Sequence, residues 1–272
     1  MSTGALLQRV TGRNNVRVSG DPTGRPVVFA HGYGCSQAMW RDVTPAFESA
    51  GYRVVTFDLV GAGDSDLTEY DQAKYDSLHG YADDVVDLLR AFDLSDVVFV
   101  GHSVSSMIGV LASIAAPELF GALVLVGPSP RYVDDVDYRG GFRREDIDAL
   151  LEALDANPLG WSEQMAPVIV GNIDRPELAD EWKTSFCRTD PEIAKHFARV
   201  TFLSDNRRDL ELVSVPTLVV QSQDDAIAST DVGRWVQERI PGSEFVALNS
   251  TGHTPNLSSP AELSEHILRF LR

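Results

Sequence analysis

The sequence has few cysteines and few positive charges. Only two of its 272 residues are cysteine, Cys35 and Cys187, and their spacing matches neither a metal-ligand pattern nor a redox motif. Lysine and arginine together number 23 against 40 acidic residues, which gives a net charge of −17. A phosphate backbone would be repelled by such a surface. We therefore expect two reduced thiols and no nucleic-acid partner.

Long apolar segments are also missing. No run of about 18 apolar residues occurs, so we expect no membrane-spanning helix and no membrane partner. The first ten residues lack a cationic stretch followed by a long apolar one, so we expect no signal peptide and a cytoplasmic location. The hydrophobic fraction of 43% is ordinary for a globular protein with a full core.

What the chain does contain is an alternation of apolar runs and amphipathic stretches. Short β-branched runs such as 97–100 are typical of buried parallel strands, and segment 80–92 has its apolar residues at helical spacing. Strands are expected at 26–30, 52–57, 97–100, 122–126, 217–221 and 244–248, and helices at 37–47, 80–92, 107–112, 230–240 and 260–271. This order predicts an α/β fold, with a mostly parallel twisted sheet and helices on both faces.

The pattern changes between about residues 130 and 204, where no convincing β run occurs. Helical segments at 143–154, 161–170, 176–186 and 191–202 are separated by Gly, Pro or Asp. Such an insertion into an α/β sheet predicts a lid. We expect an α/β core made of residues 1–129 and 205–272, and a four-helix lid at 130–204.

The most specific motif is Gly101-His102-Ser103-Val104-Ser105, between a predicted strand and a predicted helix. It follows the G-x-S-x-G pattern of a nucleophile elbow, in which a sharp turn lifts the serine oxygen clear of the sheet. One position departs from the pattern, because the closing glycine is Ser105. We predict that Ser103 is a nucleophile.

A serine nucleophile needs a base, and the base needs a third group that fixes its tautomer. In the arrangement that accompanies this elbow, the order along the chain is Ser, acid, His. His253, in a loop after strand 244–248, is the histidine that fits. Asp224 and Asp225 both follow strand 217–221, and adjacent residues leaving a strand point in different directions. We favour Asp225 as the acid and keep Asp224 as the alternative.

An oxyanion hole requires backbone N–H groups aimed at the developing negative oxygen. One should come from Val104, the residue after the nucleophile. The other should come from the loop after strand 26–30, most plausibly from Tyr33. A simple strand-ending turn is the alternative interpretation of this loop.

Two weaker patterns point to no further chemistry. Asp134, Asp135 and Asp137 resemble a calcium loop, but Arg139 occupies the next ligand position and no closing Glu follows. Residues 61–63 resemble a fragment of a dinucleotide fingerprint that lacks its third glycine. We expect no metal and no cofactor.

At this point the chain resembles the RsbQ-type hydrolases of the α/β-hydrolase superfamily, which comprise the bacterial stress-response regulator RsbQ and the plant karrikin and strigolactone receptors. The stretches that carry the resemblance are HGYGCSQAMW, FDLVGAGDSD, YDSLHGYADDVVDLL, VGHSVSSMIGVLASI, PELF, VGPSPRYVDD, YRGGF, FCRTDPEIA and TGHTPNLSSP. They cover nearly the whole chain. In that family the residue two after the nucleophile is Gly or Ser, so Ser105 fits. The resemblance also implies Asp225 as the acid and Tyr33 as the second oxyanion donor.

The resemblance further implies an apolar pocket between the lid helices and Ser103. Besides Tyr33, its wall would include Tyr132, Phe142, Leu150, Trp161, Met165 and Phe202. The alternative for each is core packing between lid and sheet. Met165 stands where plant receptors tend to have Phe, and Tyr replaces Phe at 33 and 132, so the resemblance leaves the ligand open.

These observations lead to a serine hydrolase acting on a small apolar ester or lactone, such as a butenolide of the strigolactone or karrikin type. The alternative is a signalling module that binds a small ligand, hydrolyses it slowly and acts on a protein partner, for RsbQ-type proteins a PAS-domain phosphatase. A carbon–carbon bond hydrolase and a cofactor-free haloperoxidase share the same fold and triad. Epoxide hydrolases and haloalkane dehalogenases are disfavoured because they have Asp where this chain has Ser103.

Overall fold

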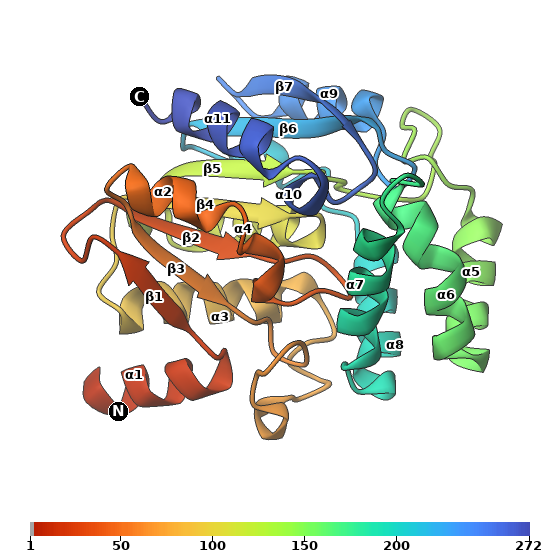
Figure 1. Cartoon of the computed structure of the whole chain (residues 1–272), viewed down its shortest axis with the longest axis horizontal. Helices are drawn as coiled ribbons and strands as arrows, with labels where there is room; N and C mark the ends of the chain where they lie inside the picture. The colour runs from red at the N-terminus through yellow and green to blue at the C-terminus, as the bar shows by residue number, and fades with distance from the viewer. Residues whose placement is uncertain (1–2) are drawn as a thin grey trace.

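One sheet of seven strands organises the protein. The structure is a computed structural model that describes residues 3–272, and the sheet order in that part is β1-β3-β2-β4-β5-β6-β7 (Figure 1). The strands are β1 (Arg17–Gly20), β2 (Pro26–Ala30), β3 (Arg53–Phe57), β4 (Val97–His102), β5 (Phe120–Val126), β6 (Thr217–Asp224) and β7 (Glu244–Thr251). Every neighbouring pair is parallel except β1 and β3, which are antiparallel. The predicted fold class is therefore confirmed.

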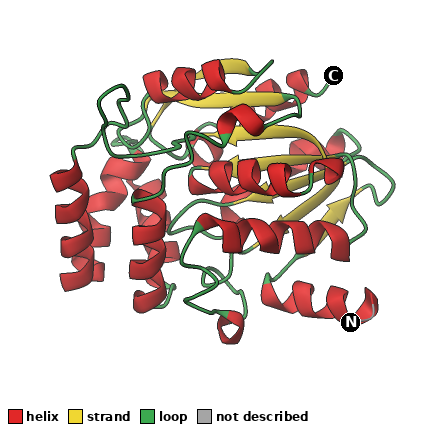
Figure 2. Cartoon of the chain, turned by 180° about the vertical axis from the view of Figure 1, so that it is seen from behind, coloured by secondary structure: helices red, strands yellow, loops and turns green. Residues whose placement is uncertain are grey.

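Helices cover both faces of the sheet, as predicted. Figures 1 and 2 show α2 (Thr44–Ser49) and α11 (Pro260–Phe270) on one face, and α3 (Leu78–Ala91), α4 (Val104–Ala115) and α9 (Thr230–Arg239) on the other. The central strand β4 is buried at all its positions, because helices lie against both of its faces. Helix α1 (Thr3–Arg13) packs against α3. Among residues 3–272, no helix is long and apolar enough to cross a membrane.

Two local predictions were wrong or incomplete. The single helix expected at 37–47 is a 3₁₀ turn, η1 (Gln37–Trp40), followed by the separate helix α2. Pro45 lies in the first turn of α2, where its missing N–H costs nothing, whereas inside a longer helix it would break the hydrogen-bond ladder. Strand β1 was not predicted, because all four of its residues are exposed and form no apolar run.

Four helices lie between β5 and β6, where the sequence predicted them. They are α5 (Arg144–Ala156), α6 (Pro158–Val170), α7 (Pro176–Cys187) and α8 (Pro191–Phe202). Proline begins three of them, at the position where its fixed φ favours helix initiation. Figure 1 shows this four-helix layer beyond the carboxyl ends of the parallel strands. The division into segments 1–129, 130–204 and 205–272 stays a prediction.

The remaining elements are short. They are α10 (Pro255–Ser258) and the 3₁₀ turns η2 (Leu67–Glu69), η3 (Pro117–Leu119) and η4 (Leu210–Leu212). Helix α10 directly follows the loop that carries His253, so it helps to define where that loop ends.

Candidate active site

Ser103 occupies a strained turn between β4 and α4. Its backbone has φ of 57° and ψ of −122°, a region that non-glycine residues rarely adopt and that costs about 1–3 kcal/mol. The turn is tight, because a Cβ at Gly101 would lie 2.3 Å from the carbonyl oxygen of Ser105. The Ser103 amide donates to the carbonyl of Val126 at the end of β5. These contacts hold the serine at the edge of the sheet, as the elbow motif predicts.

Three predicted side chains meet in one hydrogen-bonded chain. The Nε2 of His253 lies 2.7 Å from the Oγ of Ser103, and its Nδ1 lies 2.7 Å from the Oδ2 of Asp225. Ser103 and His253 are buried, and the Asp225 side chain is 1% exposed. If the imidazole is neutral with its proton on Nδ1, it donates to Asp225 and accepts from the Ser103 hydroxyl. That arrangement is the one a general base requires.

Asp225 and Asp224 have different environments. The Oδ1 of Asp225 accepts hydrogen bonds from the amides of Ile227 and Ala228, at 2.8 and 3.0 Å. Its Oδ2 also accepts from the Nε2 of Gln221, at 2.9 Å. Asp224 is exposed, and its carbonyl accepts from the amide of Gly252. The structure thus brings Asp225, not Asp224, to His253.

Gln221 is a part of this site that the sequence interpretation missed. Its amide bridges Asp225 and the carbonyl of Ala228, so it fixes the carboxylate from the strand side. A signal was available, because a single amide directly follows the apolar run 218–220, four residues before the acid. A polar side chain buried within a strand needs a partner, and here the partner is the acid.

The loop after β2 lies directly beside the nucleophile. A Cβ at Gly32 would approach the Cβ of Ser103 to 3.1 Å and the Nδ1 of His102 to 2.6 Å. Tyr33 follows Gly32 in this loop, and Val104 begins α4 directly after Ser103. Both predicted oxyanion donors are therefore on segments adjacent to the Ser103 side chain. Their role in binding an oxyanion stays a prediction.

The aromatic side chain of Tyr33 lies at the centre of a cluster that joins this loop to the four-helix layer. Its ring centroid lies 6.2 Å from that of Trp161, 5.8 Å from Phe197 and 6.0 Å from Phe202. Its hydroxyl donates to the carbonyl of Ala194 in α8, at 3.0 Å. Burial raises the pKa of the Tyr33 hydroxyl. Phe186 and Phe197 also belong to this cluster, although the sequence interpretation did not include them.

The other predicted pocket residues fall into two groups. Tyr132 is buried, its ring lies 5.1 Å from that of Phe202, and burial raises its pKa to about 12, opposed by the nearby Ser103 hydroxyl. Phe142, Leu150 and Met165 are half-buried and pack against the core. The Tyr132 hydroxyl thus lies near the Ser103 hydroxyl, whereas Phe142, Leu150 and Met165 are placed only against the core. That these residues contact a substrate stays a prediction.

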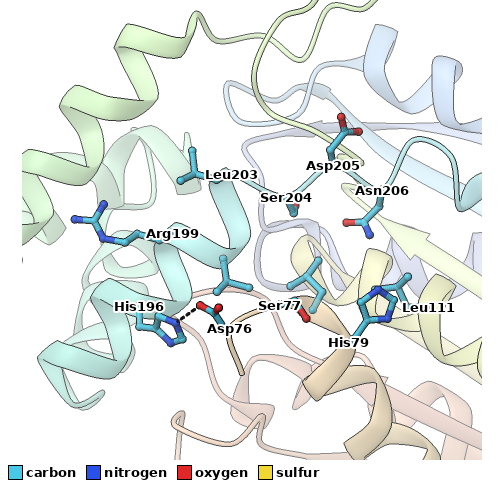
Figure 3. Close-up of a pocket in the computed structure, with 12 residues that line it drawn as sticks. Asp76, Ser77, His79, Leu111, His196, Arg199, Leu203, Ser204, Asp205 and Asn206 are labelled. Atoms are coloured by element: carbon cyan, nitrogen blue, oxygen red, sulfur yellow. Dashed lines mark hydrogen bonds and ion pairs between the residues drawn. The ribbon is translucent and has the colours of Figure 1, made fainter. Parts of the chain in front are cut away.

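A separate cavity of about 430 Å³ lies where α8 meets α3 and α4. Its lining includes His196 and Arg199 from α8, Leu111 from α4 and Asn206 from the loop after α8, and His196 pairs with Asp76 across it (Figure 3). Ser103 and His253 are not among the lining residues. Within residues 3–272, His, Cys, Asp and Glu side chains form no group of three or more that could hold a metal ion.

Comparison with known proteins places this geometry in context. The sequence profile described as "Alpha/beta hydrolase family" matches residues 27–266. Karrikin insensitive 2 receptor CA from Petunia hybrida is 40% identical over 261 residues, 95% of each chain. Strigolactone esterase D14 from Arabidopsis thaliana is 39% identical over 259 residues, 94% of this chain and 96% of the esterase. The solved structure of a hydrolase from Oleispira antarctica is 39% identical, with a TM-score of 0.94 over 97% of each chain.

Proposed function

Because this chain belongs to the α/β hydrolase family, we propose that it is a serine hydrolase that cleaves a small apolar ester or lactone. The observation that carries the proposal is the chain of two 2.7 Å contacts from Ser103 through His253 to Asp225. A backbone turn of this kind exposes a serine hydroxyl at the end of a parallel sheet, where the base can reach it. One relative at 39% identity is also named as an esterase.

The proposed mechanism uses only groups of this chain and one water. The Oγ of Ser103 bonds to the carbonyl carbon of the substrate while its proton passes to the Nε2 of His253. The amides of Val104 and Tyr33 stabilise the negative oxygen of the tetrahedral intermediate. The carbon–oxygen bond to the leaving group then breaks, and His253 returns the proton to the leaving oxygen. Water repeats the sequence on the acyl-enzyme and releases the acid, and no cofactor takes part.

The proposed substrate class rests on the aromatic rings that join Tyr132, which lies near the Ser103 hydroxyl, to the four-helix layer. Tyr33, Tyr132 and Phe202 offer ring surfaces and little charge, which favours an apolar acyl or lactone group. Two relatives are named for a karrikin and for a strigolactone. Their names support a butenolide lactone as the first substrate to test.

A second candidate is ligand sensing with slow hydrolysis, because one relative at 40% identity is named as a receptor. In that case a single ligand would be cleaved and retained, and the change would pass to a protein partner such as a PAS-domain phosphatase. The number of turnovers separates the two candidates. Many rapid turnovers per enzyme support the hydrolase, whereas a single turnover with retained product supports the sensor. A cytoplasmic location, where such a partner would lie, stays a prediction.

The test of the proposed chemistry is the hydrolysis of p-nitrophenyl acetate by the wild type and by Ser103→Ala. We expect the variant to lose at least about 10³-fold in kcat/KM, because the nucleophile is gone and only binding and oxyanion stabilisation remain. A thermal unfolding curve for the variant controls for misfolding. Unchanged turnover in a folded Ser103→Ala protein would contradict the proposal.

A further inference from the structure

Two residues of the elbow hold the backbones of the loops that complete the site. We propose that His102 and Ser105 are positioning residues: His102 fixes the loop that carries His253, and Ser105 fixes the loop that carries Tyr33. The inference rests on the proposed function, because it assigns each residue to one part of that reaction. His102 directly precedes the nucleophile, and Ser105 lies two residues after it. Together they would position the base and the oxyanion donors around Ser103.

His102 is bound to the backbone of the catalytic histidine. Its Nε2 lies 2.7 Å from the carbonyl oxygen of His253, and since a carbonyl can only accept, Nε2 carries the proton. Its side chain is buried, and burial lowers its pKa to about 3, so the ring stays neutral at working pH. The amide of His253 donates to the carbonyl of Ile169 in α6. Both backbone groups of the base are thereby held.

The other nitrogen of His102 shows that the imidazole lowers the stability of the fold. Its Nδ1 is buried and has no hydrogen-bond partner in the described part of the chain. A buried acceptor without a partner costs about 1–3 kcal/mol. An apolar side chain of similar size would avoid that cost and would leave the His253 carbonyl without this donor. The imidazole therefore serves the base loop more than it serves the stability of the core.

Ser105 makes the corresponding contact on the other side. Its Oγ donates to the carbonyl of His31 at 2.5 Å, and the residue is fully buried. His31 is the first residue of the loop after β2, and Gly32 and Tyr33 follow it. A glycine at position 105 would have no group with which to hold this carbonyl. Ser105, which departs from the elbow pattern, thus connects the first turn of α4 to the loop after β2 that carries Tyr33.

The two residues should give different kinetic signatures, because they act on different parts of the reaction. Loss of the Ser105 contact should weaken transition-state stabilisation, and therefore lower kcat while KM changes little. Loss of the His102 contact should let His253 move relative to Asp225 and Ser103. That change should alter the pH dependence of kcat/KM, which reports the protonation of the base.

The Ser105 experiment compares Ser105→Ala with Ser113→Ala. Ser113 lies on the same helix, is buried, and also donates to a carbonyl, that of Val110 at 2.8 Å. With p-nitrophenyl acetate we expect Ser105→Ala to lower kcat about tenfold, and Ser105→Thr to recover part of that kcat. Phenylboronic acid mimics the tetrahedral intermediate, so Ser105→Ala should bind it about tenfold more weakly. Ser113→Ala should stay within about twofold of the wild type. Equal losses in Ser105→Ala and Ser113→Ala, or none in Ser105→Ala, would overturn the assignment.

The His102 experiment compares His102→Leu with His102→Gln, whose amide can still donate to the His253 carbonyl. We expect His102→Leu to lower kcat/KM about tenfold and to change its pH profile, and His102→Gln to keep the wild-type profile. A loss in both variants with an unmoved profile would indicate a merely structural role and overturn the proposal.

A readout independent of turnover separates failure of this inference from failure of the proposed function. The proton on Nδ1 of His253 can be observed by ¹H NMR, because it is hydrogen-bonded to Asp225 and buried away from exchange with water. Its resonance should shift or disappear in His102→Leu and persist in His102→Gln, even if the wild type hydrolyses no ester. An unchanged resonance in His102→Leu would overturn the His102 assignment.

Discussion

Different forces hold two neighbouring regions of the molecule. One is the edge formed by the carboxyl ends of the strands, where Ser103 lies, and the other is the four-helix layer beyond it. At the edge, buried side chains bond to one another or to backbone carbonyls at 2.5–2.9 Å, as Ser103, His253, Asp225 and Ser105 do. The four-helix layer meets the core through aromatic rings around Tyr33 and through partly exposed ion pairs such as Arg188–Asp64. Exposed pairs contribute about 0–1 kcal/mol each. Substitutions among the hydrogen-bonded groups near Ser103 should therefore have the larger effects, on rate or on pH-dependent stability, and substitutions between layer and core the smaller ones.

The largest effect is expected at the acid. Asp225→Asn keeps the size of the side chain but cannot hold His253 in the required tautomer, so kcat should fall by about 10³–10⁴-fold. Asp224→Asn is the matched control, since it makes the same change in an exposed neighbour, and it should stay within about twofold. Kinetics with p-nitrophenyl acetate measure both. Similar losses in the two variants would contradict the assignment of Asp225.

A pH-dependent effect on stability should come from His102. Its pKa falls from 6.5 when unfolded to about 3 in the fold because burial disfavours the charged form. The unfolded chain then binds more protons between these values, so stability is full above pH 6.5 and is lost as the pH falls. From pH 7 to pH 5 this one group should cost about 2 kcal/mol.

Urea unfolding at pH 7 and pH 5 measures this loss. His102→Gln removes the titrating group, so its drop in unfolding free energy should be about 2 kcal/mol smaller than that of the wild type. Ser113→Ala, which removes a buried hydroxyl but no titrating group, should show the wild-type drop. A His102→Gln protein that loses as much as the wild type would show that the ring does not carry this pH dependence.

The smallest effect is expected at the contact between loop and layer. Tyr33→Phe removes the hydrogen bond to the Ala194 carbonyl and keeps the ring contacts, so the free energy of unfolding should fall by about 1 kcal/mol. The kcat should change less than threefold, because the proposed oxyanion donor is the backbone amide. Urea unfolding and ester kinetics check the two parts, with Tyr52→Phe as a control far from the layer. A tenfold loss of kcat would instead place the Tyr33 hydroxyl in the chemistry.

The same contrast explains what could be predicted from the sequence. Ser103, Asp225 and His253 each follow a strand of a parallel sheet, whose carboxyl ends converge, so order along the chain predicted that these segments would meet. Order alone left Asp224 as an alternative to Asp225, because both follow the same predicted strand. The aromatic cluster around Tyr33 could not be found in this way. Phe186 and Phe197 lie on different helices, and helical periodicity does not say which helix faces which loop. Strand β1 escaped because its exposed residues leave no hydrophobic pattern.

The central claim is that Ser103 forms a covalent acyl intermediate with the help of His253. The most direct measurement is mass spectrometry of the peptide that carries Ser103, after rapid acid quenching of the enzyme with p-nitrophenyl acetate. The account predicts an acetyl group on Ser103 in the wild type and its absence in Ser103→Ala. An unmodified Ser103 peptide during full turnover, or an adduct on His253 alone, would contradict it.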